Sequence, residues 1–364
     1  MKKIQKIAIV GAGNAGCVTA LHYHLYLEIE KIVDDYEIDI YHSPDQHPIE
    51  KVGQGTTLKV AELIADTLDI NWYNNPIGAT FKSGILYDGW GNSNDEFFHP
   101  FQWSDMGIHF VPNKLSETVI KSGYFNVIEK TIKEPEKEID ADVIFDCRGR
   151  HNRDKSNYDK LINPLDSVLL SKKYERDVDL IYTRCVATPN GWTFVIPNKD
   201  SVSYGYLYNS EITTREDAVD DFTSRFDLDY IIDSLKFENY MAKNMFVGER
   251  TVLQGNMYGF IEPLEATSLG LYQSLCRQAW DYIFGLRTDV YCNHKMRVIM
   301  KETETFLLWL YGYGSKYDTP FWKYAKSLPF NPDDRFNHMC NNYPNDDVYG
   351  QWSQYSFDIV KKYC

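Results

Sequence analysis

The hydrophobic and polar pattern at the start of the chain predicts a strand, a tight turn and a helix. The stretch "KIAIVGAGNAGCVTALHYHLYL" (6–27) opens with a short apolar run, which is typical of a buried strand. After a glycine-rich turn, apolar residues recur at Val18, Leu21 and Leu25, and this spacing gives a helix one apolar face. The next segment, "YEIDIYHS" (36–43), alternates apolar and polar residues and predicts a second strand.

The turn between the first strand and the helix carries the pattern Gly-x-Gly-x-x-Gly. Its glycines permit a tight turn, a close approach of the backbone to a pyrophosphate, and close packing of the helix on the strand. The helix N-terminus adds free N–H groups and a partial positive charge. In this strand–turn–helix context the pattern predicts a dinucleotide-binding site, and the alternative is a glycine-rich turn of another α/β protein. The predicted contacts are Gly11, Gly13, Ala15 and Gly16.

The end of the second predicted strand departs from the usual dinucleotide pattern. An acidic residue normally stands there and binds the ribose hydroxyls, but this chain has His42. A neutral imidazole can still hydrogen-bond a hydroxyl group. We therefore expect His42 to contact the cofactor, with Asp45 as a substitute.

Composition and charge disfavour several classes of protein. The 364 residues are 43% hydrophobic and 25% charged, as in a globular protein. The net charge of −14 disfavours nucleic acid as a partner. No apolar run is long enough to span a membrane, and the N-terminus does not resemble a signal peptide, so we expect no membrane partner.

The cysteines and histidines predict neither disulfides nor a metal site. The 7 cysteines include no C-x-x-C pair, and the 9 histidines include no H-E-x-x-H. This pattern is typical of reduced thiols, and it predicts a cytoplasmic location in the producing or host cell. His22 and His24 are expected on a helix as structural residues. The oligomeric state stays open, with a homo-oligomer possible.

Two later segments favour FAD over NAD as the dinucleotide. The stretch "ADVIFDCRGR" (141–150) resembles the strand of FAD-dependent monooxygenases that returns to the cofactor beside the first glycine-rich turn. The stretch "GNMYGFIEPLEATSLG" (255–270) resembles their segment beside the flavin, with asparagine for the usual aspartate. The resemblance implies an α/β, monooxygenase-like fold with Rossmann-type FAD binding. It adds four expected cofactor contacts: Asp146, Gly149, Asn256 and Gly259.

Six motifs follow one another along the chain. After the glycine-rich turn come "SPDQHPIEKVGQGTTL" (43–58), "GATFKSGILYDGW" (78–90), "GWTFVIP" (191–197), "GFIEPLEATSLG" (259–270) and "YDTPFWKYAKSLPF" (317–330). The fourth is similar to W-x-W-x-I-P and the fifth to G-F-x-E-P-L-E-S-T-G, and both patterns are typical of tryptophan halogenases. On these motifs the chain resembles a flavin-dependent halogenase of the tryptophan-halogenase family. Its shortness, with many tyrosines and asparagines, also resembles halogenases encoded by marine viruses.

The resemblance implies a reaction and two catalytic residues. In the family, FADH2, O2 and halide (chloride, bromide or iodide) yield hypohalous acid, which diffuses through a tunnel to an electron-rich aromatic substrate of indole or phenol type. A separate flavin reductase supplies the FADH2. Lys82 falls on the lysine that receives the hypohalous acid, and Glu265 on the active-site glutamate. A lysine within an apolar stretch is costly to bury without a role, and a snorkelling surface lysine is the alternative.

The same resemblance implies a halide site and a substrate site. The backbone N–H groups of Thr267 and Ser268 correspond to the halide site, although Ala266 and Ser268 differ from the family residues. A helix N-terminus suits an anion. His99 and Phe101 are the expected contacts of the aromatic substrate, and an aromatic core loop is the alternative.

The motif "GWTFVIP" predicts a barrier. A strand has a side-chain period of two, so Trp192, Phe194 and Ile196 share one face. In the family this face lies near the flavin–substrate junction and keeps the organic substrate away from the flavin. An ordinary core strand is the alternative, because aromatic residues at this spacing are common in sheets.

We expect residues 1–364 to form one interleaved flavoprotein unit. The C-terminal part is shorter than in tryptophan halogenases, which predicts a more open pocket and argues against free tryptophan as the dedicated substrate. The expected FAD-binding module is mostly 1–70, 136–150 and 245–290, and the substrate module of sheet and C-terminal helices is mostly 71–135, 160–240 and 291–364.

Two other functions stay open. An aromatic hydroxylase of the same flavoprotein superfamily would bind its substrate beside the flavin, and Lys82 and the predicted barrier argue against it. A degenerate flavoprotein, retained as a binding or structural subunit, is supported by five departures from the family pattern, at His42, Gln54, Asn256, Ala266 and Ser268. A product that carries added oxygen and no bromine would favour the hydroxylase. Failure to bind FAD under any condition would favour the degenerate flavoprotein.

Overall fold

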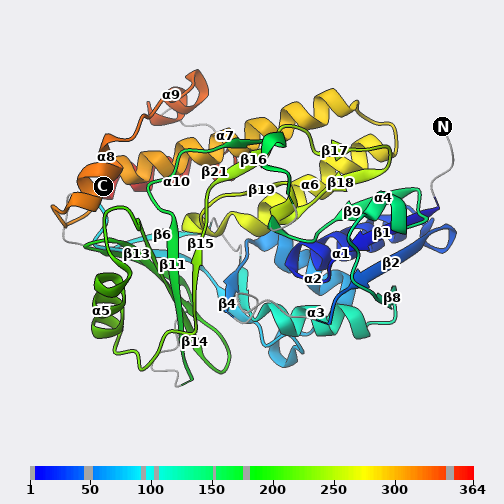
Figure 1. Ribbon diagram of the computed structural model, residues 1–364, viewed down its shortest axis with the longest axis horizontal. Coiled ribbons are helices and arrows are strands. Elements are labelled where there is room, and N and C mark those ends of the chain that lie inside the picture. Colours follow the sequence, from blue (N-terminus) through cyan, green and yellow to red (C-terminus); the bar gives the residue numbers. More distant parts are fainter. Residues whose placement is uncertain are drawn as a thin grey trace.

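The structure is a computed structural model, and it describes residues 5–44, 52–91, 96–101, 106–150, 153–174, 181–341 and 348–364. Asp45 lies outside the described residues. Figure 1 shows one sheet with α1 and α2 at the right, a second sheet at the left, and the long helix α7 along the top. Within the described residues, no helix combines the length and the apolar composition needed to cross a membrane.

The first sheet has six strands and is built around the N-terminal strand. All of its neighbouring pairs are parallel except the outermost pair, β17·β18. In order, its strands are β17 (Phe246–Val247), β18 (Thr251–Leu253), β9 (Val143–Asp146), β1 (Lys6–Val10), β2 (Glu37–His42) and β8 (Asn126–Glu129).

The predicted strand–turn–helix unit is present at the start of this sheet. Helix α1 (Asn14–Ile29) follows β1 and packs against α2 (Leu58–Leu68) and α6 (Ser268–Ile283). A Cβ atom on Gly16 would lie 1.8 Å from the carbonyl oxygen of Gly11, so only glycine lets the helix approach the turn this closely.

One segment of the expected substrate module packs with the six-stranded sheet. Residues 112–129 were expected in the substrate module, but they form α3 (Pro112–Lys121) and β8. Strand β8 pairs in parallel with β2, and α3 packs against α1. Strand β8 therefore forms one edge of the six-stranded sheet, and α3 is the helix that precedes it in the chain. Parallel strands need a crossover connection of this kind, which is usually a helix.

The second sheet has seven strands and carries the predicted barrier. Its neighbouring strands are antiparallel except β12·β5, which are parallel. In order, the strands are β15 (Asp233–Lys236), β11 (Ser167–Lys173), β14 (Val202–Tyr208), β13 (Gly191–Pro197), β12 (Thr183–Thr188), β5 (Gly84–Asp88) and β6 (Phe97–Pro100).

Three small sheets connect these layers. Two of them have three strands: β3 (Gln54–Gly55), β7 (Gly107–Phe110) and β4 (Thr80–Lys82), and then β10 (Tyr158–Lys160), β16 (Tyr240–Ala242) and β19 (Gly259–Phe260). The third pairs β20 (Val348–Tyr349) with β21 (Trp352–Ser353). The remaining helices are α4 (Pro135–Glu138), α5 (Arg215–Phe226), α7 (Asp289–Tyr313), α8 (Pro320–Ser327), α9 (Asp334–Cys340) and α10 (Gln354–Tyr363).

The C-terminal segment packs aromatic side chains against α7. Trp352 is 3% exposed, and its ring stacks on Phe306 of α7 at 4.0 Å between centroids. Phe357 of α10 is fully buried and contacts the Phe306 ring edge-on. These few C-terminal residues therefore bury a large aromatic area against α7, and the more open pocket stays a prediction.

Candidate functional site

One cavity of about 700 Å³ extends from the glycine-rich turn to the strand β13. Most of the residues expected at the cofactor and the barrier line it, although they come from both large sheets. They are Gly11, Gly13, Ala15, His42, Gly149, Asn256, Trp192, Phe194, Ile196, Glu265 and Ser268.

Three residues expected at the cofactor do not line this cavity. Gly16 packs against Gly11, and Gly259 pairs with Met241 inside a small sheet. Asp146 is buried, and its carboxylate accepts two hydrogen bonds from the Arg148 guanidinium, at 2.8 and 2.7 Å. These contacts tie the three residues to neighbouring parts of the fold, and their contact with a cofactor stays a prediction.

The cavity also contains cations that the sequence did not single out. Arg148 and Arg150 both line it. Burial lowers the pKa of Arg150, although a guanidinium remains charged in proteins. Together with the N-terminus of α1, these cations fit the pyrophosphate of a dinucleotide, and the cavity is elongated enough to join this end to β13. The residues present therefore fit FAD.

The predicted barrier is a real wall of this cavity. Trp192 is fully buried, and its ring meets the rings of Phe194 and Trp90 edge-on, at 6.3 and 6.4 Å. A Cβ atom on Gly205 of the neighbouring strand would lie 2.1 Å from the Phe194 ring, so the absence of a side chain there lets this ring lie flat on the sheet.

Lys82 is fully buried at the end of β4, beside this cavity. Its Nζ has no hydrogen-bond partner among the described residues, and it lies 5.0 Å from the centroid of the Phe101 ring. A Cβ atom on the cavity-lining Gly55 would be 3.1 Å from this Nζ. Burial lowers the pKa of Lys82 from 10.5 to about 8, while the carboxylate of Glu265 opposes this fall.

Glu265 is the most heavily hydrogen-bonded carboxylate of the site. Its Oε1 accepts from Tyr87 Oη and lies 3.2 Å from His99 Nδ1, and its Oε2 accepts from Trp352 Nε1 at 2.9 Å. Burial alone would raise the pKa of Glu265, but the His99 imidazole and the three hydrogen bonds lower it to about 2. Glu265 is therefore a permanent negative charge near Lys82.

The backbone that presents Glu265 is strained. Glu265 and Ala266 have φ angles of +70° and +53°, in a backbone region that residues other than glycine rarely adopt. They lie between Pro263 and the first turn of α6. Strain of this kind persists only where the surroundings hold it, and it concentrates at functional sites.

The two residues expected at the aromatic substrate lie against Glu265 and Lys82. His99 Nδ1 faces Glu265, and His99 Nε2 lies 3.0 Å from Ser356 Oγ in the C-terminal helix. Phe101 places its ring beside Lys82. Both residues are therefore located at the predicted site, but they contact Glu265 and Lys82 directly.

The two residues expected to bind halide, Thr267 and Ser268, lie at the N-terminus of α6. Ser268 is the first residue of this 16-residue helix and lines the cavity, whereas Thr267 is buried behind it. The first N–H groups of a helix have no intrahelical acceptor, and they carry a partial positive charge. This end of α6 therefore offers the cavity a surface that suits an anion.

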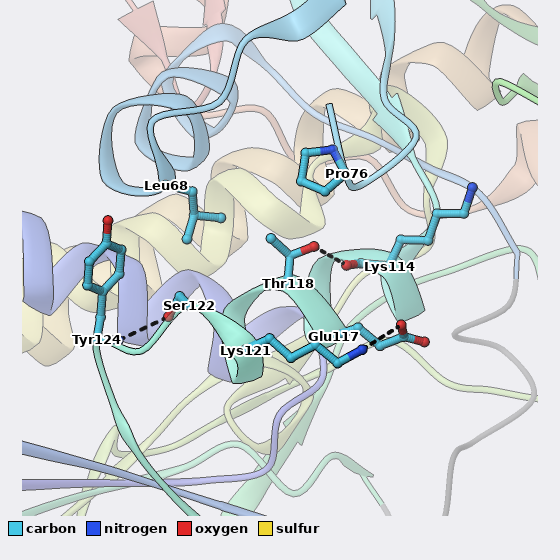
Figure 2. Close-up of a pocket in the computed structure, with 8 residues that line it drawn as sticks. All are labelled: Leu68, Pro76, Lys114, Glu117, Thr118, Lys121, Ser122 and Tyr124. Carbon is cyan, nitrogen blue, oxygen red and sulfur yellow. Dashed lines mark hydrogen bonds and ion pairs between the residues drawn. The ribbon is translucent and has the colours of Figure 1, made fainter. Parts of the chain in front are cut away.

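A second hollow, of about 530 Å³, lies over α3 (Figure 2). Its polar groups are already paired: Lys121 Nζ lies 3.6 Å from Glu117, Lys114 Nζ lies 3.4 Å from Asp200, and Thr118 donates to a backbone carbonyl. We assign no chemistry to it. Within the described residues, no group of three or more histidines, cysteines or carboxylates could hold a metal ion.

Comparison with known proteins gives the family. The family model described as "Tryptophan halogenase" matches residues 6–114 and 103–357, and the chain therefore belongs to the tryptophan halogenase family. Among curated relatives, it is 25% identical over 251 residues to the tryptophan 7-halogenase RebH of Lentzea aerocolonigenes, which covers 64% of this chain and 47% of that protein. It is 22% identical over 335 residues to the tryptophan 6-halogenase ThaL of Streptomyces albogriseolus, covering 82% of this chain and 62% of that protein.

Solved structures share the fold over nearly the whole chain. BrvH, a flavin-dependent halogenase from Brevundimonas sp. BAL3, superposes with a TM-score of 0.82 at 16% identity, covering 98% of this chain and 89% of that one. Xcc4156, a flavin-dependent halogenase from Xanthomonas campestris, gives 0.80 at 17% identity, covering 98% and 88%. The predicted α/β class with a Rossmann-type cofactor fold is confirmed. The chain nevertheless spans 47% and 62% of the length of the two curated relatives above.

The sequence did not single out three residues that surround Glu265 and His99, namely Tyr87, Trp352 and Ser356. Tyr87 stands in the motif of Lys82, two positions after Ile85, so strand alternation could have placed it on the face that meets the site. Trp352 and Ser356 carry no local signal, because they reach the site only through the fold of the C-terminal segment.

Proposed function

We propose that this chain is a flavin-dependent halogenase that uses FADH2, O2 and halide to halogenate an electron-rich aromatic compound of indole or phenol type. The single observation that carries the proposal is the pair of Lys82 and Glu265. Among the described residues this fully buried amine has no hydrogen-bond partner, and it lies within the electrostatic reach of the Glu265 carboxylate, beside a cavity that fits FAD. Burying an ammonium group without a hydrogen-bond partner destabilises the folded state, and such groups are found mainly at functional sites.

FADH2 held in the cavity would supply two electrons to O2, and O2 would be the oxidant that turns halide into hypohalous acid, with its second oxygen atom leaving as water. The N-terminus of α6 would hold the halide through backbone N–H groups near Ser268. The wall formed by Trp192, Phe194 and Ile196 would exclude a bulky aromatic molecule from the flavin end. The hypohalous acid, which is small, would pass on to Lys82.

Lys82 and Glu265 have separate tasks in this reaction. With a pKa of about 8, Lys82 is mostly protonated at neutral pH, so it can donate a hydrogen bond to the oxygen of hypohalous acid. The ring carbon takes the halogen, the oxygen leaves as water with a proton from Lys82, and the proton lost from the ring restores the ammonium. Glu265, with a pKa of about 2, is too weak a base to keep that proton. It stabilises the ammonium and orients it.

The proposed partners follow from this chemistry: a small aromatic substrate and a flavin reductase as electron source. The viral-type likeness, the cytoplasmic location and the oligomeric state stay predictions. None of the observations favours free tryptophan over another electron-rich ring.

The test supplies FAD, NADH, a flavin reductase and bromide to the purified chain, with a panel of indoles and phenols. Mass spectrometry is expected to show a brominated product that disappears in Lys82→Ala. A product carrying oxygen and no bromine would support the hydroxylase instead. Failure of the purified chain to bind FAD under any condition would support a degenerate flavoprotein kept as a binding or structural subunit.

A further inference from the structure

A second carboxylate, Glu262, is buried three residues before Glu265 and is not explained by the proposed reaction. It is 1% exposed and does not line the cavity. Its Oε1 accepts a hydrogen bond from Tyr311 Oη at 3.0 Å, and its Oε2 accepts one from the backbone N–H of Leu264 at 3.1 Å. Its own N–H donates to Asn239 Oδ1 at 2.9 Å.

The first of these bonds connects Glu262 to the wall. Tyr311 uses its hydroxyl proton toward Glu262, so its oxygen is free to accept from Trp192 Nε1, at 2.9 Å. The result is a directed chain from the indole N–H through the phenol to the carboxyl group. Hydrogen bonds that follow one another in a water-excluded interior polarise and strengthen one another. This series of two bonds fixes the rotation of the Trp192 ring against the cavity.

The second bond connects Glu262 to the strained turn. The Leu264 N–H is the last backbone donor before Glu265, whose φ of +70° is unfavourable for a side chain. A carboxylate that holds this N–H restricts the backbone just before Glu265. Glu262 therefore contacts both parts of the site, the wall and the turn, through its two oxygens.

Ordinary packing does not account for Glu262. Among the described residues its carboxyl group makes no ion pair, and the groups that act on it are the Tyr311 hydroxyl, the Leu264 N–H and the Trp192 indole N–H. Burial raises the pKa of Glu262 to about 7, despite the opposing hydrogen bonds from Leu264 and Tyr311. A buried carboxyl group without a cation is costly, and an apolar side chain of similar size would be cheaper if packing alone were needed.

We propose that Glu262 is a positioning residue that couples the Trp192 wall to the Glu265 turn, and so determines what fraction of the oxidant reaches the aromatic substrate. This proposal rests on the proposed function. If either connection loosens, the wall or the turn moves, and hypohalous acid or hydrogen peroxide escapes before it meets the ring.

Two variants separate the two connections. Tyr311→Phe breaks only the connection to Trp192, because the bond from Leu264 remains. Glu262→Gln keeps one oxygen acceptor and turns an NH2 group toward the other donor. Because the amide can turn either way, only one of the two connections is made at a time, and both are weakened. The matched control is Glu304→Gln, since Glu304 is also buried, lies on the same helix as Tyr311, and accepts a backbone N–H, that of Ile162.

The experiment measures two quantities for each protein: brominated product formed per FADH2 oxidised, and hydrogen exchange of the segments 191–197 and 263–268. Glu262→Gln is expected to lower the product ratio about tenfold, as for the loss of a buried hydrogen bond of about 1.4 kcal/mol, with faster exchange in both segments. Tyr311→Phe is expected to speed exchange only in 191–197. The affinity for FAD should stay unchanged, and Glu304→Gln should keep both quantities at the wild-type value.

A wild-type product ratio with wild-type exchange in Glu262→Gln would overturn the proposal. So would an equal loss in Glu304→Gln, because the effect would then be one of general stability. If the wild-type chain forms no brominated product, the proposed function fails, but the exchange pattern still decides whether Glu262 holds the wall and the turn.

Discussion

Lys82→Met tests whether the buried amine is held at a cost for the sake of a reaction. Methionine has a similar length, is unbranched, and packs well beside aromatic rings, so it can fill the space next to Phe101. The substitution removes the charge without leaving a large cavity. We expect the variant to be more stable than the wild type and to form no halogenated product.

The magnitude follows from burial. The pKa of Lys82 falls from 10.5 to about 8 on folding, so the unfolded chain holds this proton more tightly than the folded one. A tenfold change in proton affinity corresponds to about 1.4 kcal/mol, and the penalty at pH 7 is therefore about 3 kcal/mol. This penalty persists below the folded pKa and is lost as the pH rises toward the unfolded value, and it is about 2 kcal/mol at pH 9.

The assay is urea unfolding of the FAD-free protein at pH 7 and pH 9, with Lys59→Met as the control. Lys59 is exposed in α2, so its replacement should change the stability by no more than about 0.5 kcal/mol. Lys82→Met should gain about 3 kcal/mol at pH 7 and less at pH 9. A variant that is equally stable or less stable at pH 7 would refute the reasoning, since Lys82 would then contribute favourable contacts that the described structure lacks.

Other predictions concern buried groups whose charge changes with pH or with a lost partner. His22 has a pKa of about 3 in the folded chain because of burial and Arg277, against 6.5 ordinarily, so stability is lost as the pH falls below 6.5. At pH 5 rather than pH 7, His22→Leu should therefore gain about 2 kcal/mol on the wild type in urea unfolding, and a constant difference would contradict this. Glu262 has the opposite effect, because its raised pKa favours the folded state at low pH. Between pH 5 and 7 the free energy of unfolding of the wild type should fall by about 2 kcal/mol relative to that of Glu262→Gln. Parallel pH profiles of the two proteins would contradict this raised pKa. Trp352→Phe removes a donor from buried Glu265 and should lower the free energy of unfolding by about 1–3 kcal/mol in thermal denaturation, whereas an unchanged Tm would show that Glu265 finds another donor.

Local pattern was enough for much of the fold and for the main site residues. The strand–turn–helix unit is specified within about two dozen residues, because a glycine turn and a helical apolar stripe depend only on near neighbours. The strand period likewise placed Trp192, Phe194 and Ile196 on one face, and they all line the cavity. For Lys82 the local pattern left a snorkelling surface lysine open and only the family resemblance assigned it to the site; the structure buries it fully.

Only the tertiary structure decided which groups surround Lys82 and Glu265, and in which charge state they are held. Trp352 is 87 positions from Glu265, and Ser356 is 257 from His99, so no spacing in the sequence relates them. Whether a carboxyl group is ionised depends on the donors that packing brings to it, which is why Glu265 and Glu262, three residues apart, have pKa values of about 2 and about 7. The chain alone determined which residues carry the chemistry. Desolvation and long-range hydrogen bonds, which exist only in the folded state, determined what those residues can do.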